Sequence, residues 1–368
     1  MRKAIFPLMF VLSLFACTEL YKADIDSDQQ VLIIDGFLGN TAGNNYVILS
    51  RSLPFDSTGI RKKITGARVL LTDNAGNNIP FKEASSGIYK PTNTLFAGEI
   101  NKTYTLTVET PDKQLYVSSP QKMLPQLNPN KVSGGYAKDV FLVKNVFGQI
   151  SKREDDICEV YYDFKNSGGE IPRFRFTSSQ IVEYAIFKEV MPPKGDISGY
   201  MFYCWFVEND NNLIFTNEKY KTSADEIKNQ MVCSTTADKR ILVPDMSIKT
   251  LFYRDTLMDW YESNRIIRVN QYRLNPDSYI WYKGIESQSA VEGKMFDPLA
   301  TQLYGNIFCK TDPEKLVLGF FEVSSVSTFS WAISRNGPGT PIVIRSVPNV
   351  YPSPNGFTIN VTPTFWIN

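Results

Sequence analysis

Short runs of β-branched and aromatic residues, separated by turn residues, dominate the first third of the chain. Over residues 31–120 about seven such runs recur every ~8–15 residues, with no helical apolar period between them. Residues 103–108 alternate strictly, so their apolar side chains share one face of a strand. The pattern predicts an immunoglobulin-like or transthyretin-like β-sandwich over residues 30–123. The strands predicted within it are 31–37, 45–50, 67–72, 79–81, 87–89, 103–108 and 113–120.

A passage rich in proline and asparagine, Leu124–Asn130, predicts a domain boundary. The larger domain expected over residues 131–336 is mainly β, with one or two short helices. A helix is predicted over Pro276–Glu286, because Asn275 or Asp277 can cap it and a proline suits its first turn. The strands predicted in this domain are 159–164, 173–176, 180–187, 201–207, 212–215, 265–272, 316–323 and 330–334.

The first 17 residues have the layout of a lipoprotein signal. A basic start and an apolar run to Phe15 precede Ala16-Cys17, so residues 1–16 are expected to be removed and Cys17 to be lipidated. The alternative is an ordinary secreted protein in which Cys17 is incidental. Residues 17–29 are polar and acidic and are expected to form a tether, and residues 337–368 a Pro-rich tail.

The chain contains no histidine, which excludes Ser-His-Asp and Cys-His nucleophilic sites and most zinc sites. Paired carboxylates, lysine or tyrosine bases and oxygen-only calcium sites remain available. No catalytic residue, cofactor or resident metal is therefore predicted. The formal net charge of +1 also argues against nucleic-acid binding, since such proteins carry a clear basic footprint.

Four cysteines remain if Cys17 carries lipid, an even number in an oxidising compartment. Their wide spacing is unlike that of a zinc site and favours disulfides. We expect Cys204 to pair with Cys309, since each follows a strand-like aromatic segment, which leaves Cys158 for Cys233. The other pairings, and buried free thiols, stay open at this point.

Several candidate sites have a plain structural alternative. Gly305–Ile307, together with Phe296–Pro298, is typical either of turns or of the lining of a ligand cleft. Asp73–Asn77 fits a hairpin turn as well as a calcium loop, and Glu154–Asp156 is typical of a solvated charged run. Five aromatic residues are candidates for core packing, sugar stacking or partner binding: Trp205, Trp260, Tyr261, Trp281 and Tyr282.

Taken in order, a set of short stretches resembles a family of Bacteroidota outer-membrane lipoproteins known as domain of unknown function 4249. The resemblance extends from about Cys17 to about Ser334, and a polar insertion at 138–156 departs from it. The stretches are Val31–Phe37, Ile48–Phe55, Gly66–Asp73, Ala97-Gly98, Thr103–Leu106, Cys204-Trp205, Val269–Leu274 with Tyr279, Phe296–Leu299, Gly305–Ile307 and Val317–Val326.

The resemblance implies a lipid-anchored outer-membrane protein, expected at the cell surface, although a periplasm-facing position stays open. Members of the family are similar to accessory proteins found beside TonB-dependent, SusC-like transporters. The resemblance thus implies a binding or assembly module for a nutrient transporter, with the membrane and the transporter as partners. Two alternatives remain, a surface hydrolase with paired carboxylates and a purely structural envelope lipoprotein. The family transfers no site residue to this chain.

Overall fold

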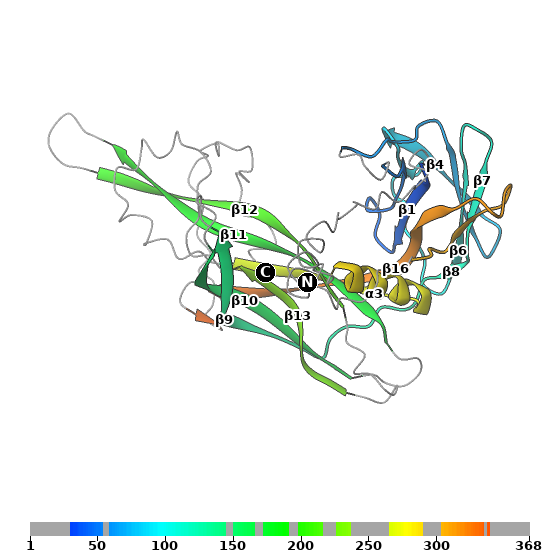
Figure 1. The fold of residues 1–368 in the computed structure, drawn as a ribbon. Coiled ribbons are helices and arrows are strands. Elements are labelled where there is room, and N and C mark those ends of the chain that lie inside the picture. The colour runs from blue at the N-terminus through cyan, green and yellow to red at the C-terminus, as the bar shows by residue number, and fades with distance from the viewer. Residues whose placement is uncertain are drawn as a thin grey trace, which may run out of the picture.

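The computed structural model describes residues 30–53, 59–144, 150–165, 172–190, 198–215, 226–236, 265–289, 303–334 and 337–338. The signal peptide, Cys17, the tether and most of the Pro-rich tail lie outside this part of the chain. Within it the fold is mainly β with one helix, as predicted. The chain forms two lobes, and a single long strand runs from one to the other (Figure 1).

The first lobe contains all seven strands predicted before residue 120, together with one further short strand. Its alternating residues point inward and form one core, which includes Ile34, Leu49, Leu71 and Leu106. The strands are β1 (Leu32–Gly39), β2 (Tyr46–Arg51), β3 (Arg68–Asp73), β4 (Asn78–Ser85), β5 (Ile88–Pro91), β6 (Thr103–Glu109), β7 (Leu115–Ser118) and β8 (Gln121–Lys122).

The second lobe consists of two packed layers of strands. Strands β13, β10 and β9 form a separate sheet, and residues of β10 and β13 share a core with β11 and β14. The elements that follow the first lobe in the chain are β9 (Lys131–Lys144), β10 (Ile150–Lys165), β11 (Phe174–Val190), β12 (Ser198–Phe215), β13 (Glu226–Thr236), β14 (Arg265–Arg273), α3 (Pro276–Ser289), β15 (Ile307–Cys309), β16 (Val317–Ser334) and β17 (Gly337–Pro338). Of these, β15 pairs with β7 of the first lobe.

Several predicted elements of this lobe need correction. The polar insertion at 138–156 belongs to the β9–β10 hairpin, which runs in register from Asp163↔Lys131 to Ile150↔Lys144. The separate strands expected at 173–176 and 180–187 are one strand, β11. Cross-strand pairing therefore continues these strands through polar residues at which no strand was predicted.

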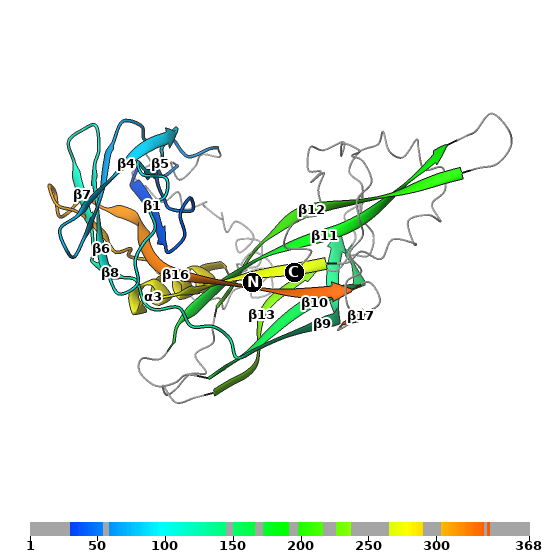
Figure 2. The same ribbon diagram turned by 180° about the vertical axis from the view of Figure 1, so that it is seen from behind.

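Strand β16 joins the two lobes into one continuous sheet. Its first half pairs in parallel with β1, from Leu32↔Val317 to Gly39↔Ser324, and its second half pairs antiparallel with β14. The resulting sheet follows the order β12-β11-β14-β16-β1-β2-β5-β4-β3-β6-β7-β15. Figure 2 shows β16 extending from the second lobe to the first. Residues 307–309 and 317–324, which the sequence placed in the second domain, thus pair with strands of the first lobe.

Glycine permits the close approach of β1 and β16. Gly319 has a φ of 100°, and a Cβ atom placed there would lie 2.0 Å from the carbonyl oxygen of Ile34. Gly305 is equally constrained, since its Cβ would lie 1.7 Å from the carbonyl oxygen of Gly319. These two positions therefore need the absence of a side chain for the parallel pairing to form.

Helix α3 confirms the predicted helix and lies at the junction of the lobes (Figure 1). The side chain of Asn275, expected as a cap, instead donates hydrogen bonds to the carbonyls of Lys122 and Val323, at 2.8 and 3.2 Å. Trp281 stacks on Phe320 of β16 with ring centroids 5.5 Å apart. These contacts fix the helix against the strand that connects the two lobes.

Candidate ligand-binding site

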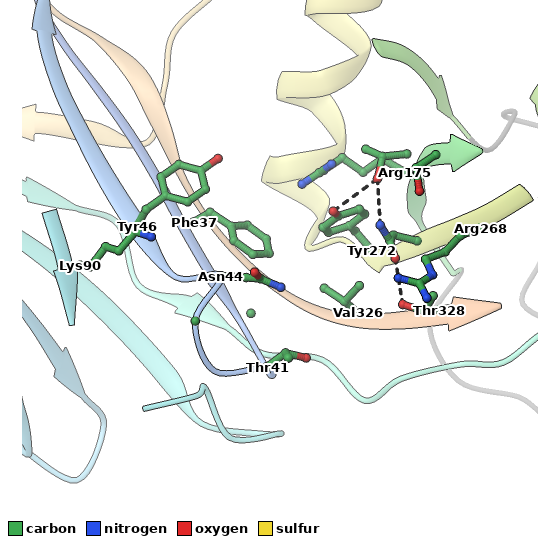
Figure 3. Close-up of a pocket in the computed structure, with 15 residues that line it drawn as sticks. Phe37, Thr41, Asn44, Tyr46, Lys90, Arg175, Arg268, Tyr272, Val326 and Thr328 are labelled. Atoms are coloured by element: carbon green, nitrogen blue, oxygen red, sulfur yellow. Dashed lines mark hydrogen bonds between the residues drawn. The ribbon is translucent and has the colours of Figure 1, made fainter. Parts of the chain in front are cut away.

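A cavity of about 770 Å³ opens where the two lobes meet. Its volume falls in the range of small-molecule sites, roughly 300–1,000 Å³. The cavity lies over one face of the continuous sheet, and the loop between β1 and β2 borders it (Figure 3). Its lining is formed by Phe37, Gly39, Thr41, Gly43, Asn44, Tyr46, Lys90, Arg175, Thr177, Ser179, Arg268, Asn270, Tyr272, Val326 and Thr328.

Strand alternation explains why these residues share the cavity. On β1 the residues Ile34 and Leu38 belong to the core of the first lobe, so Phe37 and Gly39 face the opposite side. The same period of two places every second residue of β11 and β14 in the cavity lining, at 175–179 and 268–272. One face of the joined sheet thus supplies side chains from both lobes.

The loop between β1 and β2 is held by two buried or half-buried amides. Asn45 Oδ1 accepts a hydrogen bond from the Gly39 N–H at 2.8 Å, and its amide donates to the carbonyl of Phe96. Asn40 Oδ1 accepts from the N–H of Val326 on β16 at 2.8 Å. These bonds position the loop that contributes Thr41 and Asn44 to the cavity rim.

Three aromatic rings cross the cavity floor from β2 to β14. The ring centroids of Tyr46 and Phe37 lie 6.0 Å apart, and those of Phe37 and Tyr272 lie 5.7 Å apart with an edge-on geometry. The Arg175 guanidinium lies over the Tyr272 ring, 3.6 Å from its centroid. The row provides an apolar surface within an otherwise polar lining.

A chain of polar side chains continues from this row along the sheet. The Thr328 hydroxyl donates to Asn270 Oδ1 at 2.8 Å, and the Asn270 amide donates to the Thr177 hydroxyl at 3.5 Å. Thr177 in turn donates to the Tyr272 hydroxyl at 3.4 Å (Figure 3). The chain orders hydrogen-bonding groups on three neighbouring strands for contact with a polar ligand.

Arg175 of the cavity lining forms an ion pair with Glu322 of β16. Its Nε and Nη2 atoms donate to the carboxylate at 2.9–3.3 Å, and both side chains are almost fully buried. Tyr282 of α3 donates a further hydrogen bond to Glu322 at 2.5 Å. Burial opposes the positive charge of Arg175, but Glu322 raises the pKa of the guanidinium further above its ordinary value.

Two other titratable groups beside this ion pair have raised pKa values. Asp35 lies at the sheet surface, and desolvation followed by repulsion from Glu322 raises the pKa of its carboxyl. Desolvation, together with the charges of Asp35 and Glu322, raises the pKa of Tyr46 to about 12. The Tyr46 hydroxyl is therefore protonated at neutral pH and can donate a hydrogen bond to a ligand.

The structure does not contain the disulfide expected between Cys204 and Cys309. Cys309 is buried as a free thiol, and its Sγ lies 3.3 Å from the Thr311 hydroxyl. The side chain of Cys204 lies outside the described residues, but its strand, β12, stands at the opposite end of the sheet order from β15, which carries Cys309. Cys158 and Cys233, the second pair expected, are fully buried on the neighbouring strands β10 and β13 but are not joined by a disulfide.

Two of the other predicted site segments have structural roles. Asn306 exchanges two hydrogen bonds with the backbone of Phe321, at 2.8 and 2.9 Å, so Gly305–Ile307 is fixed against β16 where β15 begins and does not line the cavity. Asp73 accepts backbone hydrogen bonds from Ala75 and Asn77, as a hairpin turn requires. No cluster of three metal-ligating side chains exists among the described residues.

The predicted aromatic candidates divide between described and undescribed positions. Trp281 packs on β16 and Tyr282 supports the ion pair, so neither lines the cavity. Phe296–Pro298, Trp260 and Tyr261 lie outside the described residues, as do the side chains of Trp205 and Glu154–Asp156.

The sequence did not identify the cavity residues, although it carried a signal for the ion pair. Glu322 interrupts the apolar run Val317–Val323, and Arg175 stands between Phe174 and Phe176. A charged residue within an apolar strand needs a partner, because burying it alone is costly. This signal indicates that each residue needs a partner, but it does not show that the two residues pair with each other.

No helix among the described residues is long and apolar enough to span a membrane. A family model described as "Domain of unknown function (DUF4249)" matches residues 18–330, as the sequence resemblance predicted. No curated protein and no solved structure matches the chain.

Proposed function

The chain belongs to the DUF4249 family, and on that premise we propose that it is a lipid-anchored binding protein of the outer membrane. It holds a polar ligand in the cavity between its lobes and assists a TonB-dependent, SusC-like transporter. The anchor is the lipidated Cys17, which needs more than one acyl chain for stable attachment. A binding role, rather than catalysis, is the function that this geometry supports best.

The cavity itself carries the proposal. Its lining combines hydroxyls, amides and cations with an aromatic floor, the composition that orients a polar ligand through few, well-placed groups. A purely structural protein gives no reason for such a recess. Because residues on both sides of the β1–β16 pairing contribute, the ligand contacts both lobes at once.

Asp35 and Glu322, two carboxylates among the described residues, do not favour the alternative of a hydrolase. Glu322 lies near enough to Asp35 for its negative charge to raise the pKa of the Asp35 carboxyl. Glu322, however, is buried and already bonded by Arg175 and Tyr282. It cannot act on a substrate as a nucleophile or proton donor without breaking that network.

Affinity purification of the tagged full-length chain from detergent-solubilised membranes tests the role. We expect a TonB-dependent transporter to co-purify with the wild-type protein. The Cys17→Ala variant provides the control, and it should lose incorporation of radiolabelled palmitate and leave the membrane fraction. Consistent absence of the transporter, or an unlipidated wild-type protein, would contradict the proposal.

A further inference from the structure

Positive charge stands at two ends of the cavity. Lys90 of β5 lies beside Tyr46, and Arg268 of β14 lies across the cavity near Thr328 (Figure 3). The lining includes no carboxylate, and Lys90 has no ion-pair partner among the described residues. Arg175, the third cation, is largely neutralised by Glu322. The described lining residues therefore include three cations and no carboxylate.

Between these cations the lining suits a molecule with hydroxyl groups and apolar ring faces. Asn44, Asn270 and Thr328 offer both donors and acceptors, which match hydroxyls in either role. The rings of Tyr46 and Phe37 provide the surface on which the C–H face of a sugar ring packs. Together these groups match a carbohydrate better than a purely apolar compound.

The position of the cavity argues against an extended peptide. Such peptides commonly bind by adding a strand to a free sheet edge. The cavity lies over β1, β16, β14 and β11, which all have neighbours on both sides in the sheet. Their backbone groups are already paired within the sheet, so recognition must come from side chains.

We infer that the cavity binds an acidic oligosaccharide, with carboxylate or sulfate groups directed to Lys90 and Arg268. This inference rests on the proposed function and specifies its ligand class. The two cations attract and orient the charged groups, while the amides, hydroxyls and aromatic rings between them contact the sugar rings.

Calorimetric titration of the full chain in detergent tests the inference. The probes are tetragalacturonate and maltotetraose, which share length and α-1,4 linkage but differ in charge. We expect tetragalacturonate to bind at least about tenfold more tightly, as charge-assisted hydrogen bonds predict. The difference should shrink with added salt, because these charges are accessible to solvent ions.

Variants locate the binding site. Lys90→Gln and Arg268→Gln should each weaken tetragalacturonate binding by about tenfold and leave maltotetraose unaffected. Lys82→Gln is the matched control, because Lys82 is exposed and pairs with Lys90 in register but does not line the cavity. Thermal unfolding of each variant confirms that it is folded.

The outcomes separate this inference from the proposed function. Equal binding of both sugars, unchanged binding in Lys90→Gln and Arg268→Gln, or binding only of an acidic tetrapeptide overturns the acidic oligosaccharide and leaves the accessory role intact. Failure of both sugars to bind also overturns it. The accessory role fails separately, if the transporter does not co-purify.

Discussion

Arg175 and Glu322 form a buried ion pair across an intervening strand. Arg175 belongs to β11 and Glu322 to β16, and β14 lies between them in the sheet. The pair connects the second lobe to the strand shared by both lobes, and Tyr282 connects α3 to the same carboxylate. It thereby fixes Arg175 of the cavity lining at the point where three elements converge.

Removal of one charge from this pair should be strongly destabilising. Glu322→Gln leaves the Arg175 guanidinium buried without its counter-charge, so we expect the free energy of unfolding to fall by about 3–5 kcal/mol. Urea titration measures the change. Glu109→Gln, which breaks the exposed pair with Lys113, is the control and should cost less than about 1 kcal/mol. Equal losses in the two variants would contradict the role given to the buried pair.

Tyr282→Phe removes only the hydrogen bond that the Tyr282 hydroxyl donates to Glu322. A buried hydrogen bond to a charged group contributes about 1.5–3 kcal/mol, and we expect a loss of that size in unfolding experiments. A double-mutant cycle with Glu322→Gln should show non-additive losses, because both residues belong to one network. Strict additivity would mean that Tyr282 stabilises the helix independently of the carboxylate.

Asp35 should make stability fall as the pH rises. Because its pKa in the folded protein lies above the ordinary value near 3.8, the native state retains this proton over a pH interval in which the unfolded chain releases it. The stabilisation is present below about pH 3.8 and is lost as the pH rises through the raised pKa. Asp35→Asn should therefore match the wild type in acid and exceed it at neutral pH, as measured by urea titration across pH.

Asp73 should change stability with pH in the opposite direction to Asp35. Hydrogen bonds from Asn77, Lys102 and Ala75 lower its pKa to about 2. Its contribution is present above about pH 3.8 and is lost as the pH falls through 2. Asp73→Asn should therefore be less stable than the wild type at neutral pH and approach it in acid. Parallel pH profiles for Asp35→Asn and Asp73→Asn would refute both assignments.

The parallel pairing of β1 and β16 should not tolerate a side chain at Gly319. Gly319→Ala combines a positive φ with a clash against the Ile34 carbonyl, and should lower the free energy of unfolding by about 3 kcal/mol or more. Gly59→Ala is the control, since a Cβ there meets nothing within 4 Å and should change stability little. Similar unfolding curves for the two variants would show that the strands separate easily at this point.

Burial alone should protect the thiol of Cys309 from alkylation. In the native protein we expect no reaction of Cys309 with iodoacetamide, because its exposed fraction is 2%. In concentrated urea without reductant, peptide mass spectrometry should find it fully alkylated. A requirement for reductant would instead reveal a disulfide and restore the pairing first expected with Cys204.

Much of the strand content could be predicted from the sequence, and little of the site. Alternation and turn residues are local signals, so the strands up to residue 120 and helix α3 were identified correctly. Of the β9–β10 hairpin only residues 159–164 were predicted as a strand, because the first part of β10 is polar and its stability comes from pairing along the ribbon. Glu322 and Arg175 stood out as charges in apolar strands, but nothing local to either residue pointed to the other.

The sequence by itself determined the β-rich class, the helix beginning at Pro276 and the family, because each depends on local patterns or on their order. Only the tertiary structure decided that β16 pairs with β1 and β14 together, and that this places Phe37, Tyr272 and Arg268 around one cavity. The physical reason is that strand pairing between distant segments depends on backbone hydrogen bonds and shared burial. These interactions produce no periodic pattern in the sequence that would identify the partner strand.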